Sequence, residues 1–335
     1  MKKYVNLFVF VFMIGACLSQ GRAQTKSAVS YKNPVVDIAM PDPTVIKAAD
    51  GYFYVYATES TRNVPIMKSK DLVEWTYCNT AFTNKTRPRF EPKAGIWAPD
   101  INYINGKYVL YYAMSVWGGE QTCGIGVATA NSPQGPFTDH GKMFRSNEIG
   151  VQNSIDPSLL QYEGRNYLVW GSFRGIYVIE LTADGLSIMP GAKKKRIAGT
   201  AFEAVYIHKY GDYYYMFASI GSCCQGVKST YKVVVGRSKK VWGPYKDKTG
   251  KPMLTNGYSL VIGANDHFVG NGHGSQIIRD DAGQDWLLYH GFSRSTPENG
   301  RILLLDQIKW DQEGWPYVEG GSPSYETQKA PVFNN

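Results

Sequence analysis

Charged residues, cysteines and helical periodicity are all scarce in this sequence. Charged side chains make up 19% of the 335 residues, whereas hydrophobic ones make up 43%. This composition excludes a disordered, strongly charged chain. The basic run "KKKR" at residues 193–196 has no interleaved aromatic residues, so we interpret it as a solvated loop and expect no nucleic-acid partner. No Pro/Gly/Ser-rich linker divides the chain, which favours a single domain.

Five cysteines are present, and none of them has the C-x-x-C spacing that is typical of metal ligands. Cys17 lies near the N-terminus, and the other four are Cys78, Cys123, Cys223 and Cys224. An oxidising compartment would permit disulfides, but adjacent cysteines bridge each other only with strain. We therefore favour buried free thiols.

Long apolar runs are absent except at the N-terminus, where two lysines precede an apolar stretch from Val5 to Ala16. This pattern predicts a signal peptide over residues 1–24, because the stretch is too short to span a membrane comfortably. Two forms stay open: lipidation at Cys17, or cleavage near Ala23 or Gln24. We expect an exported bacterial protein that is periplasmic, secreted or an outer-membrane lipoprotein. We also expect a monomer without a transmembrane segment, in which one domain covers residues 25–335.

Aromatic and β-branched runs follow a turn glycine five times. "GYFYVYATE", "GKYVLYYAMS", "GRNYLVWGSF", "GDYYYMFASI" and "GQDWLLYHGF" begin at Gly51, Gly106, Gly164, Gly211 and Gly283. Each run predicts a strand, and the segment after each one reads as strand, turn, strand. Four strands in each of five repeats, at intervals of roughly fifty to seventy residues, predict an all-β, five-bladed β-propeller.

An ionisable residue lies roughly six to ten residues before each turn glycine. These residues are Asp42, Asp100, Asp156, Glu203 and His273. Any one of them could be a turn residue, since Asp beside Pro is common in turns. Five at matching positions of a repeat instead predict four carboxylates and one histidine around the end of a central channel. Such a ring is costly, because like charges force their pKa values apart, and it indicates a functional site.

At these residues the sequence resembles glycoside hydrolase family 43, five-bladed propellers that cleave α-L-arabinosyl or β-D-xylosyl linkages with inversion. The resemblance rests on "PDPTVI", "WAPDINYINGKYVLYY", "NSIDPSLL" and "FEAVYIHKYGDYYYMF", and it extends over nearly all of residues 34–322. The stretch "GSCCQGVKSTYKVVVGRSKKVWGPY" is most similar to the endo-arabinanase branch, which cuts α-1,5-linked arabinan. The resemblance therefore implies an endo-1,5-α-L-arabinanase that breaks down plant polysaccharide.

The resemblance also implies roles for three carboxyl groups. Asp42 matches the general base, Glu203 the general acid, and Asp156 the residue that orients the acid and tunes its pKa. An inverting base must hold a water molecule opposite the leaving group. The prolines on either side of Asp42 would restrict its backbone where misplacement slows the reaction. Repulsion from Asp156 would raise the pKa of Glu203 and keep it protonated.

Other site residues follow from the same resemblance, as substrate-binding positions. Trp97 is expected to stack on a sugar, although core packing between blades is the competing interpretation. Asp100 is expected to hold the channel network, and Asn153, Ser172 and Phe173 resemble arabinose-contacting positions. His273 matches the histidine near a central-channel metal, often Ca²⁺. A buried, hydrogen-bonded histidine is the alternative, because calcium prefers oxygen ligands.

Three departures from the family pattern leave the substrate open. Val205 stands where proline is usual, Pro41 where many endo-arabinanases have histidine, and "GHGS" replaces "GHNS". An exo-acting α-L-arabinofuranosidase or a β-xylosidase therefore remains an alternative. A non-catalytic propeller that binds arabinose-containing glycans is another, but it would not need a complete set of base, acid and orienting residue.

Overall fold

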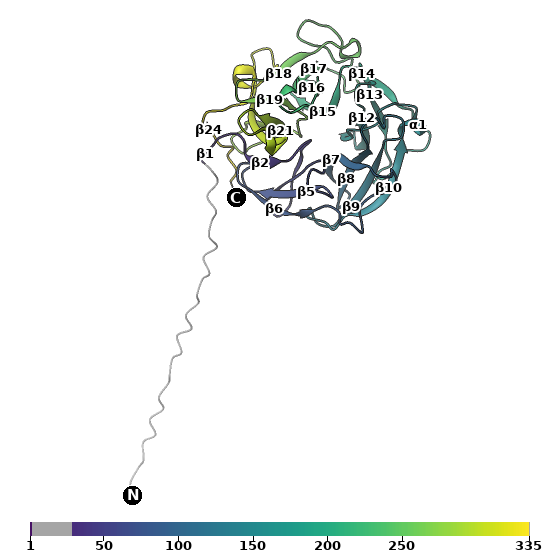
Figure 1. The fold of residues 1–335 in the computed structure, drawn as a ribbon, viewed down its shortest axis with the longest axis horizontal. Coiled ribbons are helices and arrows are strands. Elements are labelled where there is room, and N and C mark those ends of the chain that lie inside the picture. Colours follow the sequence, from purple (N-terminus) through teal and green to yellow (C-terminus); the bar gives the residue numbers. More distant parts are fainter. Residues whose placement is uncertain (2–28, 335) are drawn as a thin grey trace.

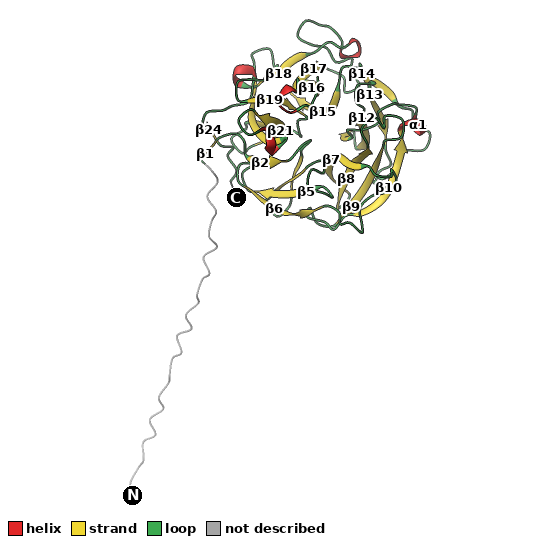
Figure 2. Ribbon diagram, in the orientation of Figure 1, coloured by secondary structure: helices red, strands yellow, loops and turns green. Residues whose placement is uncertain are grey.

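The structure is a computed structural model, and it describes residue 1 and residues 29–334. The expected signal peptide, apart from Met1, lies outside the described residues, as does Cys17. Strands dominate, and the helical segments are short (Figure 2). They are α1 (Ser146–Ile149) and the single-turn segments η1 (Gly226–Lys228), η2 (Met253–Thr255), η3 (Pro297–Asn299) and η4 (Glu319–Gly321). No helix among the described residues is long and apolar enough to cross a membrane.

Five antiparallel sheets form a ring, which confirms the β-propeller prediction (Figure 1). Blade 1 contains β3 (Thr44–Lys47), β4 (Phe53–Tyr56), β5 (Pro65–Ser69) and β6 (Trp75–Thr80). Blade 2 contains β7 (Gly95–Ile104), β8 (Lys107–Ser115), β9 (Gly124–Ala130) and β10 (Thr138–Arg145).

The next two blades repeat this order from the inner strand to the outer one. Blade 3 contains β11 (Ser158–Tyr162), β12 (Arg165–Trp170), β13 (Ile176–Glu180) and β14 (Lys195–Ala198). Blade 4 contains β15 (Glu203–Tyr210), β16 (Tyr213–Ile220), β17 (Lys232–Ser238) and β18 (Ser259–Ile262).

Blade 5 is assembled from both ends of the chain. It contains β19 (Phe268–Gly272), β21 (Asp285–Ser293) and β22 (Ile302–Trp310), and its outer strand is β2 (Val36–Ala39). The short strands β20 (Ile278–Arg279) and β23 (Pro316–Tyr317) pair with β21 and β22, and β1 (Ser30–Tyr31) pairs with β24 (Gln328–Lys329). The expectation that the fifth repeat supplies its own fourth strand is therefore wrong. The N-terminal strand fills that place and closes the ring.

Apolar clusters fill the space between each pair of adjacent blades. Each blade is covered on both faces by its neighbours. Its strands therefore carry near-continuous aromatic and aliphatic runs instead of alternating apolar and polar residues. For example, all four residues of β4 are buried. Tyr56 and Tyr112 belong to the cluster between blades 1 and 2, and Tyr111 and Trp170 to the one between blades 2 and 3. The many tyrosines thus form much of the core.

Candidate active site

A cavity of about 740 Å³ opens at the face where the inner strands of the blades begin. Residues from all five blades line it. They include eight residues that the sequence singled out: Asp42, Trp97, Asn153, Asp156, Ser172, Phe173, Glu203 and His273. The fold therefore brings together side chains that lie more than two hundred positions apart in the chain.

One residue at the inner edge of each blade has a left-handed backbone. Its φ angle is 54° at Asp42, 56° at Asp156 and 49° at His273, and Ala98 and Ala204 occupy this place in blades 2 and 4, at 42° and 53°. Such a conformation is disfavoured for residues other than glycine and persists only where surrounding contacts hold it.

Side chains of the neighbouring blades supply those contacts at four of the five positions. The amide N–H of Asp42 donates to His290 Nδ1 (3.0 Å). The Ala98 amide donates to Thr58 Oγ1 (2.7 Å) and the Ala204 amide to Asp156 Oδ2 (3.1 Å). The His273 amide donates to Ser219 Oγ at 2.8 Å. The active-site backbone is thus positioned across blade boundaries.

The sequence suggested that the five ionisable residues occupy matching positions in their blades. Measured from the left-handed residue of each blade, only three of them do. Asp42, Asp156 and His273 are equivalent, but Glu203 comes one residue before the left-handed position of its blade. Asp100 comes two residues after it. The distance to the turn glycine hides this difference, because the inner strands vary in length and carry bulges between Trp97 and Asp100 and between Glu203 and Tyr206.

Asp42 is a buried carboxylate surrounded by donors. Its Oδ1 accepts a hydrogen bond from Arg301 Nη1 (2.6 Å), and its Oδ2 accepts one from Thr58 Oγ1 (2.6 Å). His273 Nδ1 lies 3.3 Å from Asp42 Oδ1. Burial alone would raise the pKa of Asp42, but the charges of Arg301 and His273 outweigh it and hold that pKa well below its ordinary value. Asp42 is therefore ionised throughout the neutral and mildly acidic range.

Glu203 is equally buried but lacks a strong cationic partner. Burial raises the pKa of Glu203 above its ordinary value, against the hydrogen bonds from Ser172 and Tyr231, and the charge of Asp42 adds to the rise. The Ser172 hydroxyl donates to Glu203 Oε2 at 2.6 Å, and the Asn153 amide donates in turn to Ser172 Oγ at 2.9 Å. Asn153 and Ser172 thus position Glu203 as well as lining the cavity.

Asp156 interacts electrostatically with both Asp42 and Glu203. Burial raises the pKa of Asp156 to about 8, with His273 opposing the rise and Glu203 and Asp42 adding to it. Because Asp156 Oδ2 accepts the amide of Ala204, it fixes the backbone directly after Glu203. The pKa of Glu203 is raised as expected, but burial is the main cause rather than repulsion from Asp156.

The position of Trp97 is compatible with both interpretations that the sequence left open, and stacking on a sugar stays a prediction. Trp97 lines the cavity, and it also packs against a small buried cluster of Ala113, Cys123 and Ile155. Its ring lies 5.5 Å from that of Trp117, which is 79% exposed and also lines the cavity. The two indoles form an aromatic wall at the cavity mouth.

Asp100 does not line the large cavity. It borders a small cavity of about 20 Å³ deeper in the channel, where it accepts hydrogen bonds from the Leu159 amide (2.7 Å) and from Asn102 Nδ2 (2.7 Å). Burial raises the pKa of Asp100 to about 6. Asp100 therefore connects blades 2 and 3 below the site, in keeping with the expected channel network.

Comparisons with known proteins agree with this geometry. The family model for glycosyl hydrolases family 43 matches residues 31–316. The chain belongs to this family. It is 37% identical over 290 residues to extracellular endo-α-(1→5)-L-arabinanase 1 of Bacillus subtilis, covering 82% of this chain and 86% of that protein. It is 36% identical over 307 residues to extracellular exo-α-(1→5)-L-arabinofuranosidase ArbA of Cellvibrio japonicus, covering 83% of this chain and 86% of that protein.

Solved structures of the family superpose on this chain. The Cellvibrio cellulosa α-L-arabinanase in complex with arabinohexaose aligns with a TM-score of 0.77 and 34% identity, over 86% of this chain and 98% of that one. The endo-arabinanase of Bacillus licheniformis aligns with a TM-score of 0.73 and 31% identity, over 87% of this chain and all of that one.

His273 lies beside Asp42 in the cavity, at the position where the resemblance implied a metal. Burial lowers the pKa of His273, but the charge and hydrogen bond of Asp42 outweigh burial and hold that pKa above its ordinary value. Within residues 29–334, no group of three or more His, Cys, Asp or Glu side chains could hold a metal ion. The described side chains do not fit a calcium ion held by several protein ligands, and the calcium site stays a prediction.

Several residues of this family 43 site were missed in the sequence. Arg301 donates to the Asp42 carboxylate, His290 accepts from the Asp42 amide, and Tyr231 hydrogen-bonds to the Glu203 carboxyl group. They come from the second and third strands of blades 4 and 5 or from the adjoining loops, and no local motif marks them. A carboxylate as buried as Asp42 does require a cationic partner, but the sequence does not say which arginine supplies it.

The paired cysteines also differ from expectation. Cys223 and Cys224 form a disulfide in the loop between β16 and β17, and both line the cavity. The interpretation as buried free thiols is wrong for this pair, because the loop places them at the cavity mouth rather than in the core. The interpretation as a buried free thiol is confirmed for Cys123. Cys78 is also free but only half-buried.

Proposed function

We propose that this protein is an inverting arabinan endo-1,5-α-L-arabinosidase. The observation that carries the proposal is that one cavity holds two buried carboxyl groups with opposite pKa shifts. Asp42 is kept ionised and Glu203 favours the protonated form. An inverting glycosidase needs one carboxylate as base and one carboxylic acid as acid. The names of the family members above support arabinan as the substrate.

The base in this proposal is Asp42. Its carboxylate accepts a proton from a water molecule as that water attacks the anomeric carbon from the side opposite the leaving group. Arg301 and Thr58 each hold one carboxylate oxygen, which fixes its plane and leaves further lone pairs for the water. Because the Asp42 amide is also held by His290, both the backbone and the side chain are positioned before substrate binds.

The acid is Glu203, which donates its proton to the glycosidic oxygen as the bond to the anomeric carbon breaks. Ser172 and Tyr231 contact its carboxyl group, and Asp156 holds the next backbone amide. We assign Asp156 as a positioning residue. Trp97 and Trp117 provide flat, partly nonpolar surfaces for the C–H faces of sugar rings, and Asn153 and Phe173 complete the wall beside the acid.

Debranched arabinan tests the proposal. The expected product is an early ladder of oligosaccharides in the β-anomeric form, since inversion converts an α-linkage to a β-product. Release of arabinose alone or of one short product from a chain end would favour the exo-acting alternative, which the similarity to the Cellvibrio japonicus protein also supports. Activity on aryl xylosides alone would favour a β-xylosidase, and binding without turnover would favour a non-catalytic propeller.

Export belongs to the same proposal. Two of the relatives named above are extracellular, and the charged-then-apolar N-terminus predicts a signal. Mass spectrometry of the protein from its native host distinguishes acylated Cys17 from a start near Thr25. An intact Met1 contradicts both forms.

A further inference from the structure

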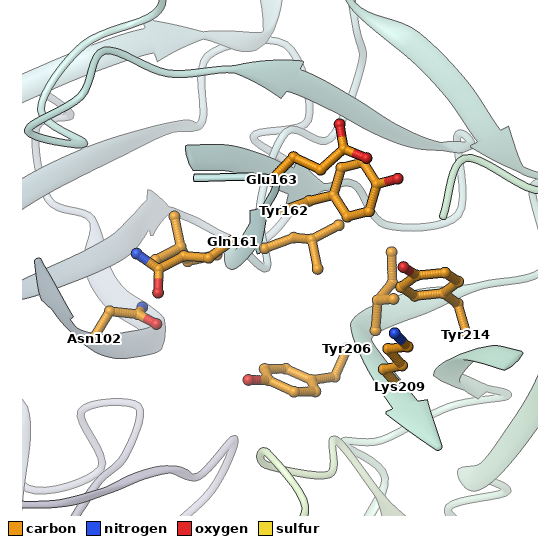
Figure 3. Close-up of a pocket in the computed structure, with 10 residues that line it drawn as sticks. Asn102, Gln161, Tyr162, Glu163, Tyr206, Lys209 and Tyr214 are labelled. Carbon is orange, nitrogen blue, oxygen red and sulfur yellow. The ribbon is translucent and has the colours of Figure 1, made fainter. Parts of the chain in front are cut away.

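A second cavity lies at the opposite end of the channel from the proposed active site. It has a volume of about 520 Å³ and lies between blades 3 and 4. β11 and β15 begin at the active-site end, near Asp156 and Glu203, and the cavity lies where they end, near Glu163 and Lys209. We call it the distal groove (Figure 3).

Three tyrosines supply the aromatic surface of the distal groove. Tyr162, Tyr206 and Tyr214 line it, and each is partly exposed. The rings of Tyr162 and Tyr214 meet edge to face, with centroids 6.1 Å apart, and Trp242 supports Tyr162 from 5.8 Å. These contacts restrict the rings, so a ligand that stacks on them does not have to order them first.

Amide side chains supply hydrogen-bonding groups on the other side of the groove, as Figure 3 shows for Asn102 and Gln161. Asn102 donates to Asp100 Oδ2 (2.7 Å), which orients its amide and leaves its carbonyl oxygen without a partner among the described residues. Gln161 donates to Asn166 Oδ1 (3.1 Å), and its carbonyl oxygen is likewise free there. Both oxygens can accept hydrogen bonds from hydroxyl groups.

The charges of the groove balance. Lys209 and Glu163 are its charged residues, and the Lys209 ammonium lies 5.7 Å from the centroid of the Tyr214 ring. One cation and one anion give no net charge, which disfavours nucleotides and other polyanions. Interspersed amides disfavour an apolar helix, which needs a continuous hydrophobic groove.

We propose that the distal groove binds a short stretch of neutral pentose polysaccharide, a second segment of the polymer that the active site cuts. Tyrosine rings match the nonpolar C–H faces of sugars, and amide oxygens match their hydroxyl groups. The volume lies within the range of small-ligand sites, about 300–1,000 Å³. The inference rests on the proposed function for the identity of the polymer. Its consequence is that polymer held at one face raises the local concentration of linkages at the other.

Binding of debranched arabinan and of linear arabinohexaose tests the groove. The measurement uses the full chain with Glu203→Gln, so that hydrolysis does not interfere. Two groove variants are compared with this parent. One is Tyr162→Ala, and the other combines Gln161→Ala with Lys209→Ala, whose side chains are exposed. The matched control is Tyr77→Ala, because Tyr77 is an exposed tyrosine on β6 of blade 1. Thermal unfolding verifies that each variant is folded.

We expect the groove variants to weaken arabinan binding about three- to tenfold, in line with the loss of one aromatic contact. The control keeps its affinity. In the chain with Glu203 intact, kcat/KM on arabinan falls by a similar factor, whereas turnover of an aryl arabinoside is unchanged because that substrate reaches only the active site. Calorimetry with arabinohexaose gives two sites in the parent, and in Tyr162→Ala one of the two loses affinity by a similar factor.

Equal arabinan affinity in both groove variants and the parent, with a single hexaose site throughout, overturns the inference. A different result separates it from the proposed function. If the unmutated chain does not cleave arabinan but one hexaose site is still weakened by Tyr162→Ala, the groove is supported and the arabinanase proposal fails.

Discussion

Asp42 and Glu203 are buried to the same degree, yet their pKa values move in opposite directions. The difference lies in their partners. Arg301 contacts Asp42 directly, whereas neutral hydroxyl groups contact Glu203. Desolvation disfavours the charged form of both groups, and at Asp42 the charges of Arg301 and His273, with a hydrogen bond from His273, outweigh it. The different roles of Asp42 and Glu203 thus depend mainly on Arg301, which lowers the pKa of Asp42.

The first residue-scale prediction separates these two roles. Glu203→Ala should impair substrates with poor leaving groups most, because an activated aryl arabinoside needs little protonation. Asp42→Ala should impair every substrate, since water activation is always required, and the loss is on the order of 10²–10⁴ in rate. A series of aryl arabinosides with graded leaving groups measures this. The same loss for both variants on all substrates would show that the roles are misassigned.

A second prediction concerns Arg301. Replacing it by methionine removes the cation that lowers the pKa of Asp42, so that pKa rises. Asp42 must be ionised to act as base, and the acid limb of the kcat/KM profile should therefore move to higher pH. The basic limb, which reflects deprotonation of Glu203, should move less. The pH dependence of aryl arabinoside hydrolysis tests this, with Arg165→Met as an exposed control far from the site. An unshifted acid limb would mean that Arg301 does not tune the base.

Residues within local motifs could be predicted from the sequence, and their partners could not. "PDP" and "SIDP" identified Asp42 and Asp156 because aspartate and proline recur at one position of the repeat. Arg301 and His290 reach the site only because blade 5 lies next to blade 1 after ring closure. The sequence does not encode that adjacency in any short pattern.

At the scale of single elements, the β-hairpins within blades were the most predictable parts. Glycine after a left-handed residue marks two-residue turns whose twist matches that of the strands. Asn105 and Gly106 have φ angles of 48° and 82°, and Glu163 and Gly164 have 50° and 73°. Asparagine tolerates this conformation better than glutamate, so the two turns differ in local strain.

An exchange of these turn residues is the element-scale prediction. Glu163→Asn should stabilise the fold by up to roughly 1 kcal/mol, because it places a favoured residue at a left-handed position. Asn105→Glu should destabilise it by a similar amount, and it also removes the hydrogen bond from Asn105 to the Ala183 carbonyl (3.0 Å). Differential scanning calorimetry measures both. Destabilisation by Glu163→Asn would show that the native glutamate makes a more important contact than its backbone costs.

At the scale of the whole molecule, a propeller must join its last blade to its first. The repeat pattern predicted four strands in every blade, but it could not show that β2 completes blade 5. That strand is only four residues long and precedes the first recognisable hairpin. β2 covers the edge of β22, which would otherwise be open to pairing with another chain. Closure also brings Arg301 and His290 beside Asp42, so the same contacts that close the ring complete the active site.

Asn33 holds this closure together from a buried position just before β2. Its Nδ2 donates to the Leu305 carbonyl (2.9 Å), and its Oδ1 accepts from the Leu305 amide (2.9 Å). Asn33→Ala should leave both backbone groups of Leu305 without this partner and destabilise the fold by about 2–4 kcal/mol. The matched control is Asp37→Ala, because Asp37 is exposed within β2 and accepts a hydrogen bond from Asn299. Thermal unfolding and amide exchange in β22 measure the effect. If Asn33→Ala unfolds like the control, apolar packing between blades closes the ring without this residue.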